Sequence, residues 1–253
     1  MARAKANAGR DEVPGFDLRA DEQRALIDSM IPMWDEYLPT IPDRRFRPGN
    51  DLFALTEAAP YDAMLRLRRP KSIIEVGSGH STMVALDARD AALPGLRITC
   101  IEPYPDRLLG LLRPGDREHI ELRQEPVQDT PLTVFDALEP GDFLFVDSSH
   151  VSKPGSDVNW LLFEVVPRLP VGVMIHFHDI FWPFEYPTEW LDERRDWNET
   201  YLLRAFLTLN DHFAVRLFLN YIWKTMPDVV AHFPDEWTPS SVQIGRASCR
   251  ERV

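Results

Sequence analysis

Five short apolar runs follow one another between residues 72 and 177, and this alternation constrains the fold more than any other feature of the chain. The segments between the runs are long enough for helices, and the runs themselves read SIIEV, RITCIE, IELRQ, DFLFVD and GVMIHF. Strands that alternate with helices are typical of βαβ units around a parallel sheet. We therefore predict an α/β fold, with a doubly wound, mostly parallel sheet and helices on both faces.

A single domain accounts for this pattern. The chain has 253 residues, of which 44% are hydrophobic, and this length and content suit one large α/β domain. We predict that residues 21–70 form an N-terminal helical extension, that 71–180 form the ligand-binding core and that 181–243 complete the domain. Residues 1–20 begin with the basic, alanine-rich MARAKANAGR and then turn acidic, so we expect a disordered tail there.

The last ten residues read as foreign to this domain. The segment IGRASCRERV, residues 244–253, has no apolar periodicity, and one back-translation of it matches a common sequencing-library adapter codon by codon. We therefore interpret 244–253 as a non-native tail that is disordered and dispensable for folding.

Composition and charge exclude several classes of function. The formal net charge is −12, which argues against nucleic acid as a partner, because phosphate binding depends on Lys and Arg. No stretch reaches the roughly 18 to 20 apolar residues of a membrane span, and no signal-peptide pattern opens the chain. Cys100 and Cys249 are too few for a disulfide framework. We expect a cytoplasmic protein without a membrane partner.

Residues suited to binding or catalysis gather where the predicted strands end. The carboxyl ends of parallel strands meet at one edge of a sheet, and open α/β sheets bind their ligands in the crevice there. We therefore expect these side chains to form one site. They are Glu75, Gly77 and Gly79 after the first strand, Glu102 after the second, Asp147 after the fourth, and His178 and Asp179 after the fifth.

Two ligands suit the glycine-containing first turn, a dinucleotide and S-adenosylmethionine. A dinucleotide fingerprint has a third glycine three residues after the second, where this chain has Thr82. The Glu75 carboxylate would repel a pyrophosphate and suits a ligand with an amino group and a sulfonium. Glu102 can accept two hydrogen bonds from a ribose diol, and bonds to a charged group contribute roughly 1.5 to 3 kcal/mol each. These residues favour S-adenosylmethionine.

Three segments carry a family resemblance. IIEVGSGHST, ITCIEP and FLFVDSSH resemble the first, second and fourth motifs of the class I S-adenosylmethionine-dependent methyltransferases. FVDSSH with the later IHFHDIF is similar to the small-molecule branch that includes the catechol O-methyltransferase type. The resemblance covers about residues 71–180. It implies a Rossmann-like fold and an enzyme that methylates, most simply on oxygen, a small-molecule acceptor.

The resemblance also implies how the sheet should end. Class I methyltransferases usually close with an antiparallel strand pair. After residue 180 only one apolar run of the right kind is visible, FAVRLFLNYI at 213–222. With 244–253 set aside, we expect the sheet to lack its last strand and to expose an unpaired edge.

Position by position, the resemblance assigns eight residues to the cofactor. Glu102 would hold the ribose, and Gln128 would lie beside the adenine, although an exposed loop amide is an equal alternative for Gln128. The full set is Glu75, Gly77, Ser78, Gly79, Ser81, Glu102, Gln128 and Asp147.

The fourth motif carries the catalytic residues that the resemblance implies, Asp147 and His150. In the catechol type the general base lies three positions after the fourth-strand Asp, which here is His150, and imidazole has a suitable pKa. The metal ligands of that type correspond to Asp147, His178 and Asp179. A histidine in place of the usual carboxylate favours Mn, Fe or Zn over Mg.

Structural roles for the same residues stay open. Asp147 could cap a turn, and His150 could be a surface loop histidine. His176 shares a strand face with His178, and we expect it in the core or behind the site. The aromatic loop 180–191 is either a lid over the acceptor or packing on the sheet edge.

Two other functions also stay open. One is a metal-dependent hydrolase that uses HFHD, residues 176–179, and the other is a family member that binds the cofactor without turnover. Cofactor binding separates a methyltransferase from the hydrolase. Methyl release to an acceptor separates it from the non-catalytic protein.

Overall fold

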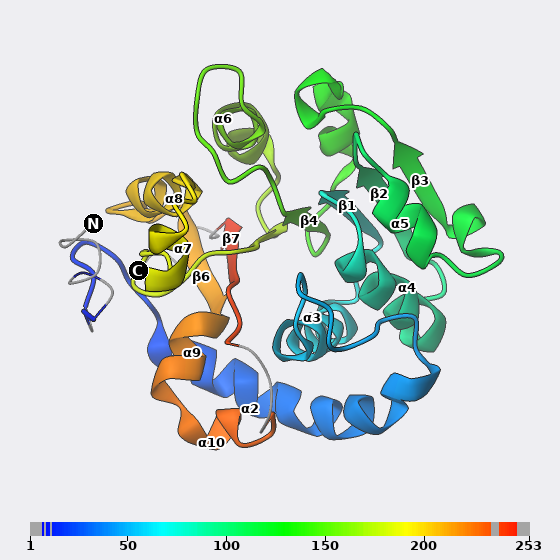
Figure 1. The fold of residues 1–253 in the computed structure, drawn as a ribbon, viewed down its shortest axis with the longest axis horizontal. Coiled ribbons are helices and arrows are strands. Elements are labelled where there is room, and N and C mark those ends of the chain that lie inside the picture. Colours follow the sequence, from blue (N-terminus) through cyan, green and yellow to red (C-terminus); the bar gives the residue numbers. More distant parts are fainter. Residues whose placement is uncertain (1–6, 8, 11, 234–237, 247–253) are drawn as a thin grey trace.

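A computed structural model describes residues 7, 9–10, 12–233 and 238–246. Its centre is a seven-stranded sheet in the order β3-β2-β1-β4-β5-β7-β6 (Figure 1). The first five strands pair in parallel, and β7 runs antiparallel to both β5 and β6. This confirms the predicted doubly wound, mostly parallel sheet. The order reverses between β1 and β4, at the centre of the sheet, where ligands bind in such folds.

All five predicted parallel strands form. They are β1 (Ser72–Val76), β2 (Arg97–Ile101), β3 (Ile120–Arg123), β4 (Phe143–Val146) and β5 (Met174–Phe177). The central strands β1, β4 and β5 are buried along their whole length, because helices cover both faces. Side chains alternate between two cores: Phe143 and Phe145 belong to one, Leu144 and Val146 to the other.

One core lies under the helices α2 (Ala20–Tyr37), α3 (Leu55–Arg68) and α4 (His80–Ala92), which lie on the same side of the sheet in Figure 1. The other core includes side chains from the helical segment after β4 and from α8 (Glu199–Leu207). That segment runs through α6 (Asp157–Trp160), a π-helical stretch (Leu161–Val165) and a 3₁₀ turn (Val166–Arg168).

The remaining helical elements are short. They are 3₁₀ turns at Leu38–Asp43, Asp116–His119, Val127–Asp129 and Leu132–Ala137, with α5 (Asp106–Leu111), α7 (Thr188–Asp192), α9 (Leu219–Thr225) and α10 (Pro227–Val230). In the described residues, no helix has the length and the apolar character that crossing a membrane would require.

The N-terminal tail differs from the expectation in its described part. Val13 is buried in the second core, and the Phe16 ring lies 5.1 Å from that of Phe184 in an edge-on contact. Residues 12–19 therefore pack against the aromatic loop before α2 begins, because their apolar side chains are buried on its hydrophobic surface. Residues 1–6, 8 and 11 lie outside the described residues.

The C-terminal end corrects two expectations. Val242–Arg246 form β7, which inserts between β5 and β6 (Phe213–Phe218), so residues 244–246 belong to the sheet and its last strand is present (Figure 1). Val242 and Ile244 are completely buried, and this burial stabilises the short strand within the sheet. The predicted run 213–222 divides into β6 and the start of α9. Residues 247–253 lie outside the described residues.

Candidate active site

The ends of β1, β4 and β5 lie side by side because the hydrogen-bond ladder continues past each strand. The backbone N–H of Asp147 donates to Val76 O at 2.8 Å, and that of His178 to Val146 O at 2.9 Å. A cavity of about 340 Å³ opens above these ends. Nine of the residues that the sequence predicts for the site line it: Gly77, Ser78, Gly79, Ser81, Glu102, Asp147, His150, His178 and Asp179.

Gly77 is the position in the first turn where only glycine fits. Its φ is +79°, and a Cβ there would lie 2.0 Å from the carbonyl oxygen of Asp147. The β1 and β4 loops therefore approach each other more closely than any side chain would allow. This contact places the Asp147 carboxylate directly beside the glycine turn.

We predict that Gly77→Ala lowers the free energy of unfolding by about 2 kcal/mol or more, because both the backbone conformation and the Asp147 contact would be strained. Gly95→Ala is the matched control, since a Cβ there meets nothing within 4 Å. Urea unfolding of both variants measures the difference. Equal stability of the two variants would contradict the close approach.

Glu75 lies beneath the glycine turn and does not line the cavity. It is fully buried, and burial raises the pKa of its carboxyl to about 7. Thr82 Oγ1 donates to Glu75 and accepts from the Gly79 N–H at 3.0 Å, so this threonine ties the turn to the carboxylate. Glu75 Oε1 and Ser78 Oγ are buried without a hydrogen-bond partner in the described part of the chain. Of these two residues, Ser78 also lines the cavity.

Glu102 occupies the edge of the cavity at the end of β2. Its two carboxylate oxygens accept from the backbone N–H groups of Ser78 at 3.2 Å and Tyr104 at 2.8 Å, which fixes the side chain. Gln128 is not among the residues that line this cavity. Its side-chain amide donates to Gly155 O at 3.1 Å, so its adenine role stays a prediction.

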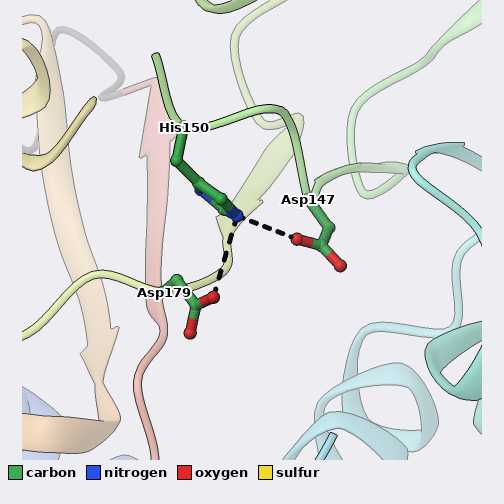
Figure 2. A group of neighbouring side chains, drawn as sticks. All are labelled: Asp147, His150 and Asp179. Atoms are coloured by element: carbon green, nitrogen blue, oxygen red, sulfur yellow. Dashed lines mark ion pairs between the residues drawn. The ribbon is translucent and has the colours of Figure 1, made fainter. Parts of the chain in front are cut away.

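Asp147, His150 and Asp179 form the chemical centre of the cavity, and Figure 2 shows the His150 ring pointing between the two carboxylates. His150 Nε2 lies 3.3 Å from Asp147 Oδ1 and 3.7 Å from Asp179 Oδ2. His150 and Asp179 both have positive φ, at 59° and 56°. A strained backbone at two of three converging residues is typical of a functional site.

His150 is buried and not a surface loop residue, because α8 holds it. Its Nδ1 lies 2.8 Å from Glu199 Oε2, and its backbone carbonyl accepts from the N–H groups of Asn198 and Glu199. Glu199 also accepts from Ser148 Oγ at 3.1 Å, and the Trp197 ring lies 4.3 Å from the imidazole. Sequence reasoning missed Glu199, since an acidic residue in the first turn of a helix already has a structural explanation.

The charges around His150 bear on its predicted role as a base. Burial would lower the pKa of its imidazole, but hydrogen bonds to Asp147 and Glu199 outweigh burial and raise it to about 10. The ring therefore holds its proton at neutral pH in this arrangement, and a metal ion at Nε2 would have to take the place of that proton. The Asp147 carboxyl is affected in the opposite sense: burial would raise its pKa, but His178 and His150 lower it.

His178 lines the cavity but lies outside the group of Asp147, His150 and Asp179. In this group His150 stands where the sequence predicts His178 as the metal ligand. Side-chain alternation in β5 directs His176 and His178 to the α3 face of the sheet. There His178 Nδ1 meets Glu57 Oε2 at 3.4 Å, a partner that sequence reasoning missed. His176 stacks on Phe145 at 4.2 Å in the core, as expected. The two histidines of HFHD therefore do not form a metal site together in the described structure.

Several known proteins are similar to this chain in sequence or fold. Residues 74–180 match the family model described as a methyltransferase domain. An uncharacterized protein of Archaeoglobus fulgidus is 33% identical over 139 residues, which cover 51% of this chain and 61% of that protein. The matching region thus spans about three fifths of the relative's length.

Two solved structures share the fold. The methyltransferase PaMTH1 of Podospora anserina, bound to S-adenosylhomocysteine, matches with a TM-score of 0.53 and 17% identity, covering 94% of this chain and 100% of that one. The O-methyltransferase of Bacillus cereus, in complex with S-adenosylhomocysteine, matches with a TM-score of 0.51 and 12% identity, covering 88% and 91%. Residues 74–180 are therefore similar to the methyltransferase domain family, and the chain shares its fold with these two methyltransferases.

Proposed function

We propose that this protein transfers a methyl group from S-adenosylmethionine to a hydroxyl oxygen of a small molecule in the cavity above β1, β4 and β5. The observation that carries the proposal is the convergence of a glycine turn, the fixed Glu102 carboxylate and the group Asp147, His150 and Asp179 on one cavity. The turn and Glu102 suit the methionyl and ribose parts of the cofactor. The three-residue group then lies where an acceptor would meet the methyl group.

A divalent cation fits the three-residue group. Two donors that share an ion at about 2.1 Å lie roughly 3.0 to 3.4 Å apart. The separations of His150 Nε2 from Asp147 Oδ1, 3.3 Å, and from Asp179 Oδ2, 3.7 Å, are close to that range. We infer that these three residues hold the metal, with His150 in the place first predicted for His178. One nitrogen and two carboxylate donors favour Mn, Fe or Zn.

The side chains around this group would each contribute to the transfer. A cation held there by Asp147, His150 and Asp179 would lower the pKa of an acceptor hydroxyl and orient its oxygen. Glu199 fixes the imidazole plane through Nδ1, which leaves Nε2 directed at the carboxylates. Glu102 and the Gly77–Gly79 turn hold the methyl donor in place, and positioning of two reactants supplies roughly 7 to 11 kcal/mol in favourable cases.

We predict that Glu102→Ala weakens binding of S-adenosylhomocysteine at least about tenfold, or 1.4 kcal/mol, because the bonds to the ribose diol would be lost. Calorimetric titration measures the affinity. Glu121→Ala is the matched control, since Glu121 lies on β3 outside this cavity and its exposed carboxylate pairs with Arg123 of the same strand. Unchanged affinity of the Glu102 variant, or comparable binding of NADH to the wild type, would overturn the cofactor assignment.

Methyl transfer itself separates the enzyme from a protein that only binds the cofactor. An acceptor screen with labelled S-adenosylmethionine, with and without Mn²⁺, measures it. We expect methyl transfer that chelation abolishes and Mn²⁺ restores. Tight cofactor binding with no transfer to any hydroxyl acceptor in either condition would favour the non-catalytic alternative.

A further inference from the structure

We propose that the acceptor is a planar aromatic molecule that carries a carboxylate and that the Arg195 guanidinium binds this carboxylate. The inference rests on the proposed function, because it names the acceptor class of the same site. It comes from a second cavity, also of about 340 Å³, next to the first.

The second cavity continues the first. Both are lined by Leu52, Phe53, His178, Asp179 and Trp197. Asp179 belongs to the three-residue group, so a molecule in the second cavity can present an oxygen to that group. The glycine turn and Glu102 line only the first cavity. The first cavity therefore suits the cofactor, and the second suits the acceptor.

Aromatic rings form much of the second cavity's wall. The rings of Phe181 and Trp190 meet edge to face at 5.1 Å, and those of Trp190 and Trp197 do the same at 5.1 Å. Phe53 and Phe181 are both buried, which fixes this wall in place. Flat, rigid apolar surfaces of this kind suit a planar ring. The aromatic loop thus supplies both packing and a wall for the acceptor.

Arg195 is the one lysine or arginine among the described residues that line this cavity. Its guanidinium lies 4.3 Å from the Trp190 ring centre and 5.4 Å from that of Trp197, and its Nε donates to Glu193 at 2.7 Å. These contacts hold the planar group, while its two terminal nitrogens form no hydrogen bond with the described residues. A guanidinium fixed in this way suits bidentate binding of a carboxylate.

Two of the three carboxylates that line the second cavity, Glu57 and Asp179, lie against histidines, and the third, Asp51, is exposed to solvent. Glu57 Oε2 lies 3.4 Å from His178 Nδ1. Asp179 lies 3.7 Å from both His150 and His178. An anionic group on the acceptor is therefore best placed at Arg195, at the exposed side of the cavity, with the reactive hydroxyl toward Asp179.

Two probes that differ in one charge test the proposal. The protein, saturated with S-adenosylhomocysteine and Mn²⁺, is titrated with 3,4-dihydroxybenzoate and with 3,4-dihydroxybenzamide in a calorimeter, where no turnover occurs. We expect the benzoate to bind at least tenfold more tightly. Arg195→Gln should remove this preference by weakening the benzoate alone, and Arg195→Lys should restore it only in part, because lysine keeps the charge but not the planar fork.

Arg194→Gln is the matched control, since Arg194 is exposed and does not line the cavity. It should keep the preference of the wild type. Three outcomes would overturn the acceptor assignment in a protein that still binds S-adenosylhomocysteine. They are equal affinity for the two probes, an Arg195→Gln variant that keeps the preference, and failure of both probes to bind. A wild type that does not bind S-adenosylhomocysteine would overturn the proposed function as well, so the two failures are distinguishable.

Discussion

A chain that ends after Ser241 should fail to fold, whereas a chain that ends after Arg246 should keep the melting temperature of the full sequence. The shorter chain loses β7 from between β5 and β6. Burial of Val242 and Ile244, each fully inaccessible, contributes roughly 1.5 to 3 kcal/mol per side chain, and two ladders of backbone hydrogen bonds are lost with them. Because a domain has about 5 to 15 kcal/mol of stability, this loss is decisive.

Thermal unfolding and solubility measure the effect. Ile244→Ala weakens the packing of β7 in a full-length chain, and we expect it to lower the free energy of unfolding by about 2 to 5 kcal/mol. A soluble protein that ends after Ser241 and melts with the full chain would show that β7 adds nothing to the sheet. The chain that ends after Arg246 tests what remains of the dispensable-tail prediction, which now concerns residues 247–253.

Periodicity predicts the centre of this fold well and its ends poorly. The runs at β1, β2, β3, β4 and β5 are distinct because strands buried on both faces need continuous apolar residues. β7 has no such signal: VQIGR holds two apolar residues, and its burial comes from the neighbours on either side. The resemblance of residues 244–253 to an adapter sequence also predicts a non-native tail where the second half of this strand lies. Whether those residues are foreign in origin stays a prediction, but Ile244 is part of the sheet.

The residues of the site likewise differ in how well the sequence predicts them. Residues at strand ends, such as Glu102 and Asp147, are predictable because topology brings strand ends together. The partners Glu57 and Glu199 are not, since they reach the site from helices 121 and 49 residues away from the histidines they contact. Each partner decides what its histidine does: Glu57 binds His178 on the α3 face, and Glu199 directs His150 at Asp147 and Asp179.

The choice between these two histidines leads to the last prediction. We expect His150→Ala to weaken Mn²⁺ binding at least about 100-fold and to reduce methyl transfer in step, because it removes a metal ligand. Glu199→Gln should weaken Mn²⁺ binding roughly 10- to 100-fold, since partners that orient a metal-binding histidine typically have effects of that size. Calorimetry gives the Mn²⁺ affinity, and titration with S-adenosylhomocysteine shows that the cofactor cavity is intact.

The matched control is the double variant Glu57→Gln, His178→Gln. Replacing both partners avoids an unpaired buried charge, which a single replacement would leave at a cost of about 3 to 5 kcal/mol. If Asp147, His150 and Asp179 hold the metal, this variant keeps its Mn²⁺ affinity within about threefold. If the site predicted from the sequence is right, with His178 as ligand, the double variant loses Mn²⁺ and His150→Ala keeps it. A His150→Ala protein that binds Mn²⁺ normally but no longer transfers methyl would instead restore His150 to the role of general base.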